Sequence, residues 1–188
     1  MNTEQKLFGS YLGLSVKQRI HHLMKNYHYR DRYVECYRQY IEGMIADMRA
    51  YECRPKEDIG VRIMSGGNNS NVTARLAEDA IKISNVFLTG HIGESLIKDK
   101  EDRRVATLAV MEWRAIRDDY AALNRALLML KPEDHELIMD FLNRKKSYYD
   151  IAEEGMLTYS SAKKKLQRIR KKVVKLTERD FERHQKNL

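Results

Sequence analysis

Proline is almost absent from this chain, and its scarcity limits what the chain can fold into. The 188 residues include two prolines, Pro55 and Pro132, and nine glycines. Lysine, arginine, glutamate, methionine, leucine and alanine, which favour helices, are plentiful. With 43% apolar residues, a chain of this length can bury a core. We predict an all-α protein built from long helices.

Two segments carry heptad-patterned apolar seams. The seam over residues 31–51 consists of Val34, Tyr37, Ile41, Met44, Met48 and Tyr51. The seam over residues 109–130 consists of Ala109, Trp113, Ile116, Tyr120, Leu123, Leu127 and Leu130. Each seam needs a partner, and residues 73–88 add a third amphipathic helix. We predict an N-terminal helical bundle; because the seams can pair within one chain or between two, a homodimer stays open.

Turn-forming residues divide the N-terminal part. Ser15 is placed to cap a short helix that extends to about residue 26. Residues 54–71 are rich in glycine, serine and asparagine, which predicts a flexible loop. The helical pattern weakens again at residues 90–93 and resumes near Asp99. We predict two domains: a helical bundle over 1–130 and a DNA-binding domain over 131–188.

The C-terminal part contains three predicted helices with clear boundaries. Pro132 suits the first turn of a helix, where a missing backbone N–H costs nothing. Ser147 and Asp150 form a Ser-x-x-Asp capping pattern at the start of a second, short helix. Gly155 ends that helix, and Thr158 can cap a third one. A short helix, a turn and a longer helix form the pattern of a helix-turn-helix.

The third helix is basic and amphipathic. Its apolar face consists of Ala162, Leu166, Ile169, Val173 and Leu176. Seven of the ten residues from 163 to 172 are lysine or arginine. The small side chain of Ala152 allows close approach of the short helix, and we expect Leu157 to be an apolar plug under the turn. These features favour docking of the third helix by one face, which leaves its basic face free.

The free face of the third helix has the residue types that bind double-stranded DNA, and the formal net charge of +8 agrees with an anionic partner. Its N-terminal side chains can reach base edges, and its later basic side chains can bind phosphates. The predicted DNA-binding residues are Tyr159, Ser160, Lys163, Lys164, Gln167, Arg168, Arg170 and Lys171.

The segment over residues 150–172 resembles region 4 of bacterial sigma factors, and the resemblance extends upstream through residues 132–138. With residues 58–62 and 70–74, the whole chain looks like the late-gene transcriptional regulators of temperate phages of Gram-positive bacteria, the ArpU-like and RinA-like group. This resemblance implies an activator of late genes that acts with host RNA polymerase in the bacterial cytoplasm or nucleoid. One departure is that the usual turn glycine is replaced by Met156, whereas Gly155 lies one residue earlier.

Two other DNA-related functions fit parts of the pattern. A sigma-like factor would capture an unpaired promoter strand with aromatic residues. The candidates for that role are Tyr27, Tyr29, Tyr33, Tyr37 and Tyr40, which lie among arginines, although Tyr37 also belongs to a seam. A small terminase-type packaging protein also joins a helix-turn-helix to a helical hairpin, but that class usually carries its DNA-binding motif first in the chain.

Signatures of catalysis and metal binding are missing from the sequence. Cys36 and Cys53 form no CxxC pair, and none of the six histidines belongs to an HExxH motif or a Cys/His cluster. We therefore expect no enzyme activity, no metal and no cofactor. No apolar run approaches the roughly 18 residues of a membrane helix, so we expect no membrane partner.

Overall fold

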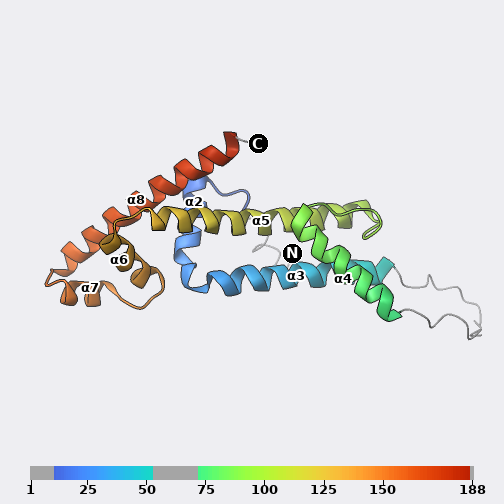
Figure 1. Cartoon of the computed structure of the whole chain (residues 1–188), viewed down its shortest axis with the longest axis horizontal. Coiled ribbons are helices and arrows are strands. Elements are labelled where there is room, and N and C mark those ends of the chain that lie inside the picture. The colour runs from blue at the N-terminus through green and yellow to red at the C-terminus, as the bar shows by residue number, and fades with distance from the viewer. Residues whose placement is uncertain (1–10, 53–71, 187–188) are drawn as a thin grey trace, which may run out of the picture. The chain divides into compact units, whose positions relative to one another are not determined.

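The chain is all-α. The computed structural model describes the backbone of residues 11–52 and 72–186 and the side chains of residues 11–52 and 77–181. Within these ranges there is no strand and no helix long and apolar enough to cross a membrane. The elements are α2 (Val16–Lys25), a 3-10 helix (Tyr27–Tyr29), α3 (Arg30–Glu52), α4 (Val72–Thr89), α5 (Lys100–Leu128), α6 (Pro132–Leu142), α7 (Tyr148–Glu154) and α8 (Tyr159–Lys186) (Figure 1). The loop predicted at 54–71 lies outside the described residues.

The helices form two compact units, whose boundaries fall inside α3 and α5. One unit comprises Met1–Val34 and Ala115–Leu188, and the other comprises Glu35–Arg114. This division differs from the predicted domain boundary at residue 130. The physical reason is that α8 packs against α2 as well as against α6 and α7, so the N-terminal helix belongs with the C-terminal ones.

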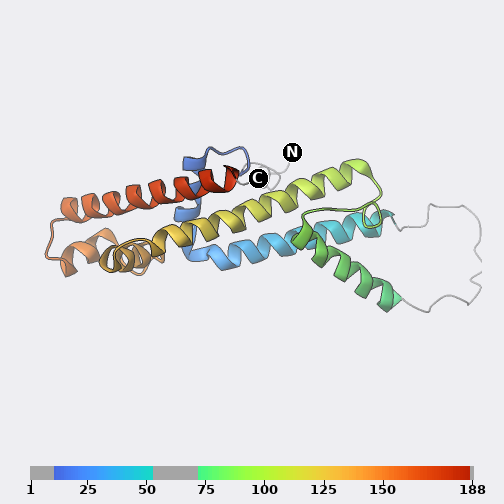
Figure 2. The same ribbon diagram turned by 45° about the horizontal axis from the view of Figure 1, so that its top comes forward.

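The unit Glu35–Arg114 is a three-helix arrangement of α3, α4 and the N-terminal part of α5 (Figure 2). The Tyr37 hydroxyl of α3 donates a hydrogen bond to the buried Glu112 carboxylate of α5 at 2.8 Å. On α4, Phe87 meets the Trp113 ring of α5 edge-on, with ring centroids 5.1 Å apart. Gly90 ends α4 with a φ of +76°, at the predicted break. This unit thus joins α3, α4 and the N-terminal part of α5, whereas most of the second predicted seam lies in the other unit.

The first seam differs in detail from the prediction. Tyr37, Ile41 and Ile45 are the buried residues of α3, whereas Tyr51 is 70% exposed. Met44 and Met48 are half-buried, and the fully buried positions step by four, so the buried face turns by about 40° around the helix at each step. The second seam is confirmed from Trp113 onward, since its members Trp113, Ile116, Tyr120, Leu123, Leu127 and Leu130 are all buried.

In the other unit, polar contacts join α2 and α8 to the C-terminal part of α5. Ser15 forms the predicted cap of α2, as a capping box with Gln18. The buried Asp119 of α5 accepts hydrogen bonds from the Tyr11 hydroxyl at 2.6 Å and from Arg19 Nε at 2.8 Å. These bonds offset the cost of burying its charge. Near the C-terminal end of α8, Asp180 forms an ion pair with Arg125 of α5 at 2.7 Å.

Candidate nucleic-acid interface

The start of α7 confirms the predicted capping pattern. Ser147 Oγ accepts hydrogen bonds from the backbone amides of Tyr149 and Asp150 at 3.2 and 3.4 Å. In return, Asp150 Oδ2 accepts from the Ser147 amide at 2.6 Å. The backbone and side-chain hydrogen bonds from Ser147 lower the pKa of the Asp150 carboxyl, so the cap is charged at neutral pH. A helix of seven residues depends on such a cap, since it has few hydrogen bonds of its own.

The turn after α7 has its positive φ at a methionine and not at the neighbouring glycine. Met156 has a φ of +50°, whereas Gly155 has a φ of −85°. The Leu157 amide closes the turn by donating to the Ala152 carbonyl at 2.8 Å. The positive φ thus falls on Met156, the position at which the resemblance places a turn glycine. Left-handed backbone at a methionine costs about 1–2 kcal/mol.

The expected plug under the turn is wrong. Leu157 is 38% exposed, and the buried apolar residues of this region are Ile151 and Ala152 on α7. The physical reason is that Leu157 lies between the end of α7 at Glu154 and the start of α8 at Tyr159, so it belongs to neither packed helix. Ala152 is buried as expected, and its small side chain lies in the helix that packs on α8.

Replacement of Met156 by glycine is expected to raise the free energy of unfolding by up to about 1.5 kcal/mol. The substitution removes the strain of the left-handed backbone, about 1–2 kcal/mol. The backbone entropy that glycine loses on folding offsets about 0.5–1 kcal/mol of this gain. No packing is lost, because Met156 is 97% exposed. Urea unfolding followed by circular dichroism measures the change. Met156→Ala keeps the Cβ atom and serves as the control; equal stabilities of the two variants would contradict this account.

Two stripes of α8 lie on opposite sides of the helix. The buried stripe consists of Ala162, Leu166, Ile169 and Val173. The exposed stripe, which we call the outer stripe, consists of Ser160, Lys164, Gln167 and Lys171. Each stripe follows the same spacing of four, three and four residues, and the two are offset by two residues, or about 200° around a helix. Half of the predicted DNA-binding residues therefore share one exposed face.

The remaining predicted residues lie on the flanks of α8. Tyr159 packs against α7, with its ring centroid 4.8 Å from that of Tyr149 and 6.0 Å from that of Tyr148. Lys163 lies on the same flank and is exposed. Arg170 also lies there, but it is half-buried in a cleft beside α2. Arg168 lies on the opposite flank, in a hollow of about 320 Å³.

The basic residues of α8 have few acidic partners. Of the seven lysines and arginines between 163 and 172, only Lys172 has a described carboxylate within 4 Å, at 3.9 Å from Asp134. Exposed arginines elsewhere do pair, as Arg104 does with Glu101 and Arg117 with Asp118. The concentrated positive charge of α8 is therefore not neutralised by the described part of the chain, and it can attract an anionic polymer.

The tyrosines considered for capture of an unpaired strand are partly core residues. Tyr37 is buried against Glu112, and Tyr27 is buried and donates a hydrogen bond to Asn124 at 2.8 Å. Tyr29 is half-exposed, with the Arg144 guanidinium 5.6 Å from its ring centroid. A continuous stacking platform needs exposed rings, so burial removes two members of the set.

Three exposed residues of this surface are not among the predicted DNA-binding residues. Lys165 and Lys172 line the hollow beside Arg168, and Tyr149 is exposed next to Tyr159. The run of basic residues could have indicated the two lysines. The tyrosines on both sides of the turn could have indicated the aromatic contact. Within the described ranges, no group of three or more His, Cys, Asp or Glu side chains could hold a metal ion.

Comparisons with known proteins give no match of any kind. No family model matches the sequence, no curated protein matches it, and no solved structure matches the fold. The resemblance to phage late-gene regulators therefore depends on the sequence motifs alone.

Proposed function

We propose that α7, the turn and α8 form a helix-turn-helix and that the protein is a sequence-specific, DNA-binding transcription regulator. The observation that carries this proposal is the outer stripe with its unpaired basic neighbours. Along this stripe, the uncharged polar residues Ser160 and Gln167 alternate with Lys164 and Lys171. The stripe lies on the face of α8 opposite the buried one. Amide and ammonium groups at this spacing suit base edges in a major groove, and lysines suit the phosphates beside it.

The resemblance adds the finer part of the proposal. A region similar to region 4 of sigma factors fits an activator of phage late genes that acts with host RNA polymerase. The Met156 conformation supports the carry-over, since the residue in place of the usual turn glycine has the positive φ that such a turn needs. The protein would act in the cytoplasm or nucleoid of the bacterial host.

A comparison of two variants tests sequence reading separately from charge. The binding site is first selected from a pool of random duplexes. Gln167→Ala is then expected to lower affinity for the selected site by roughly 1–3 kcal/mol, the value of one base contact, and to leave random-duplex binding unchanged. Lys171→Ala is the matched control on the same stripe; it should weaken both kinds of binding alike, because phosphate contacts carry no sequence information.

Two outcomes would overturn the proposal. If selection enriches no sequence, and Gln167→Ala changes selected and random binding equally, α8 is an electrostatic clamp. If light scattering finds a ring of eight or more subunits, the packaging function is favoured instead. A monomer or dimer supports the regulator, and a dimer predicts a repeated half-site about 34–36 Å apart.

A further inference from the structure

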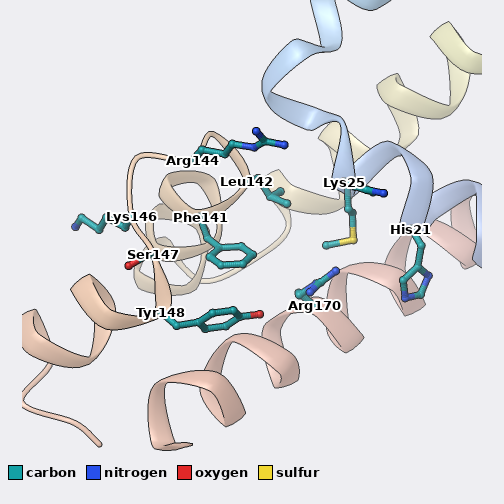
Figure 3. Close-up of a pocket in the computed structure, with 10 residues that line it drawn as sticks. His21, Lys25, Phe141, Leu142, Arg144, Lys146, Ser147, Tyr148 and Arg170 are labelled. Carbon is teal, nitrogen blue, oxygen red and sulfur yellow. The ribbon is translucent and has the colours of Figure 1, made fainter. Parts of the chain in front are cut away.

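A cleft of about 560 Å³ lies beside α8, within the unit that contains α2. Its walls come from three parts of the chain: α2, the segment from the end of α6 to the start of α7, and α8 (Figure 3). The volume is within the range of about 300–1,000 Å³ that is usual for small-molecule sites. The Phe141, Tyr148 and Arg170 side chains point toward the space between these elements (Figure 3).

The charged residues that line the cleft are all basic. None of its ten lining residues is an aspartate or a glutamate. Two of its cations already have partners: Lys146 pairs with Glu154 and Asp140 at 2.7 and 3.1 Å, and Arg144 lies over the Tyr29 ring. Two others, Lys25 on α2 and Arg170 on α8, have no ion pair among the described residues.

Lys25 also acts on a neighbouring group of α2. Burial is the main cause of the lowered pKa of the His22 imidazole, and the Lys25 ammonium lowers it further. An anion in the cleft can accept charge-assisted hydrogen bonds from Lys25 and Arg170. A guanidinium from one wall and an ammonium from another make a site for a carboxylate, sulfonate or phosphate group.

The other walls are apolar and aromatic. The Phe141 and Tyr148 rings lie with centroids 4.9 Å apart, and Met24 and Leu142 add buried apolar surface. Such a surface suits the flat ring of an aromatic ligand. It suits the sugar-phosphate backbone of DNA less well, because that backbone has no aromatic ring. We propose that this cleft binds a small aromatic anion, with its charged group at Lys25 and Arg170 and its ring against Phe141 and Tyr148.

Methionine methyl NMR of the full-length protein tests the site directly, with anilinonaphthalene sulfonate as the probe. Met24 lines the cleft, whereas Met156 is fully exposed at the turn. We expect a saturable shift of the Met24 methyl signal, assigned with Met24→Leu, and no shift at Met156. Uncharged phenylnaphthylamine, which has the same rings, should bind at least tenfold more weakly because it lacks the anion.

Paired variants identify the cationic groups. Arg170→Gln and Lys25→Gln should each weaken the sulfonate by about tenfold, as loss of a charge-assisted bond does. Lys171→Gln and Lys17→Gln remove the same charge from α8 and α2 outside the cleft and should leave the affinity unchanged. Circular dichroism verifies that each variant is folded.

Three results would overturn this proposal: no saturable Met24 shift, equal affinity for the uncharged compound, or equal weakening by the control variants. A Met24 shift that random duplex DNA produces, with displacement of the sulfonate, would also overturn it, because the occupant would then be the DNA backbone. Since the probe titration contains no DNA, its result is independent of whether α8 reads sequence.

Discussion

Leu166→Ala is expected to lower the free energy of unfolding by about 2–5 kcal/mol, as a cavity in a packed core does. Leu166 lies at the centre of the buried stripe of α8 and is 0% exposed. Its neighbours on that stripe, Ala162 and Ile169, are fixed by the same helix and cannot move in to fill the space. Urea unfolding followed by circular dichroism measures the loss.

The chain offers a matched control for this prediction. Leu128 is 74% exposed at the end of α5 in the same unit, so Leu128→Ala makes the same chemical change without a cavity. Its effect should stay within about 0.5 kcal/mol, as for most surface substitutions. Equal losses in the two variants would mean that α8 is not docked by its buried stripe.

Salt should weaken DNA binding steeply. The exposed cations near the outer stripe are Lys163, Lys164, Arg168 and Lys171, whereas Arg170 lies in the cleft. If each of these four contacts one phosphate, the slope of log K against log salt is about −3.6, at −0.9 per contact. Affinity for duplex DNA then falls roughly 150-fold between about 50 and 200 mM salt.

Fluorescence anisotropy of a labelled duplex measures this slope. Lys171→Gln should reduce its magnitude by about 0.9, and Lys17→Gln, on α2, should leave it unchanged. A fifth contact from Arg170 would steepen the slope to about −4.5. Binding that is insensitive to salt would exclude α8 as the phosphate-binding surface.

Local chemistry explains which parts of the fold could be predicted. The cap at Ser15, the Ser147–Asp150 capping box and the break at Gly90 each depend on residues within a few positions of one another. Backbone conformation and hydrogen bonding at this range follow from residue type. The helices of the C-terminal part therefore begin and end close to their predicted residues, and the buried stripe of α8 follows from its spacing.

Features that depend on distant contacts could not be predicted in the same way. The exposure of Leu157 depends on how α7 and α8 pack, and the choice of Ile45 over Met48 depends on helix crossing. The basic character of Arg170 predicts a phosphate contact. Its place in the cleft follows from the packing of α2 on α8, which no local pattern reveals.

The hydrogen bonds at Asp119 also affect when this protein can fold during synthesis. They join Asp119 to Tyr11 and Arg19, which are 108 and 100 positions away in the sequence. On the ribosome, α2 therefore emerges long before either α5 or α8 is available to it. Because such distant contacts form slowly, this unit completes its folding only after α8 has been released. Premature termination before α8 would leave α2 with an uncovered apolar face, the kind of surface that chaperones bind.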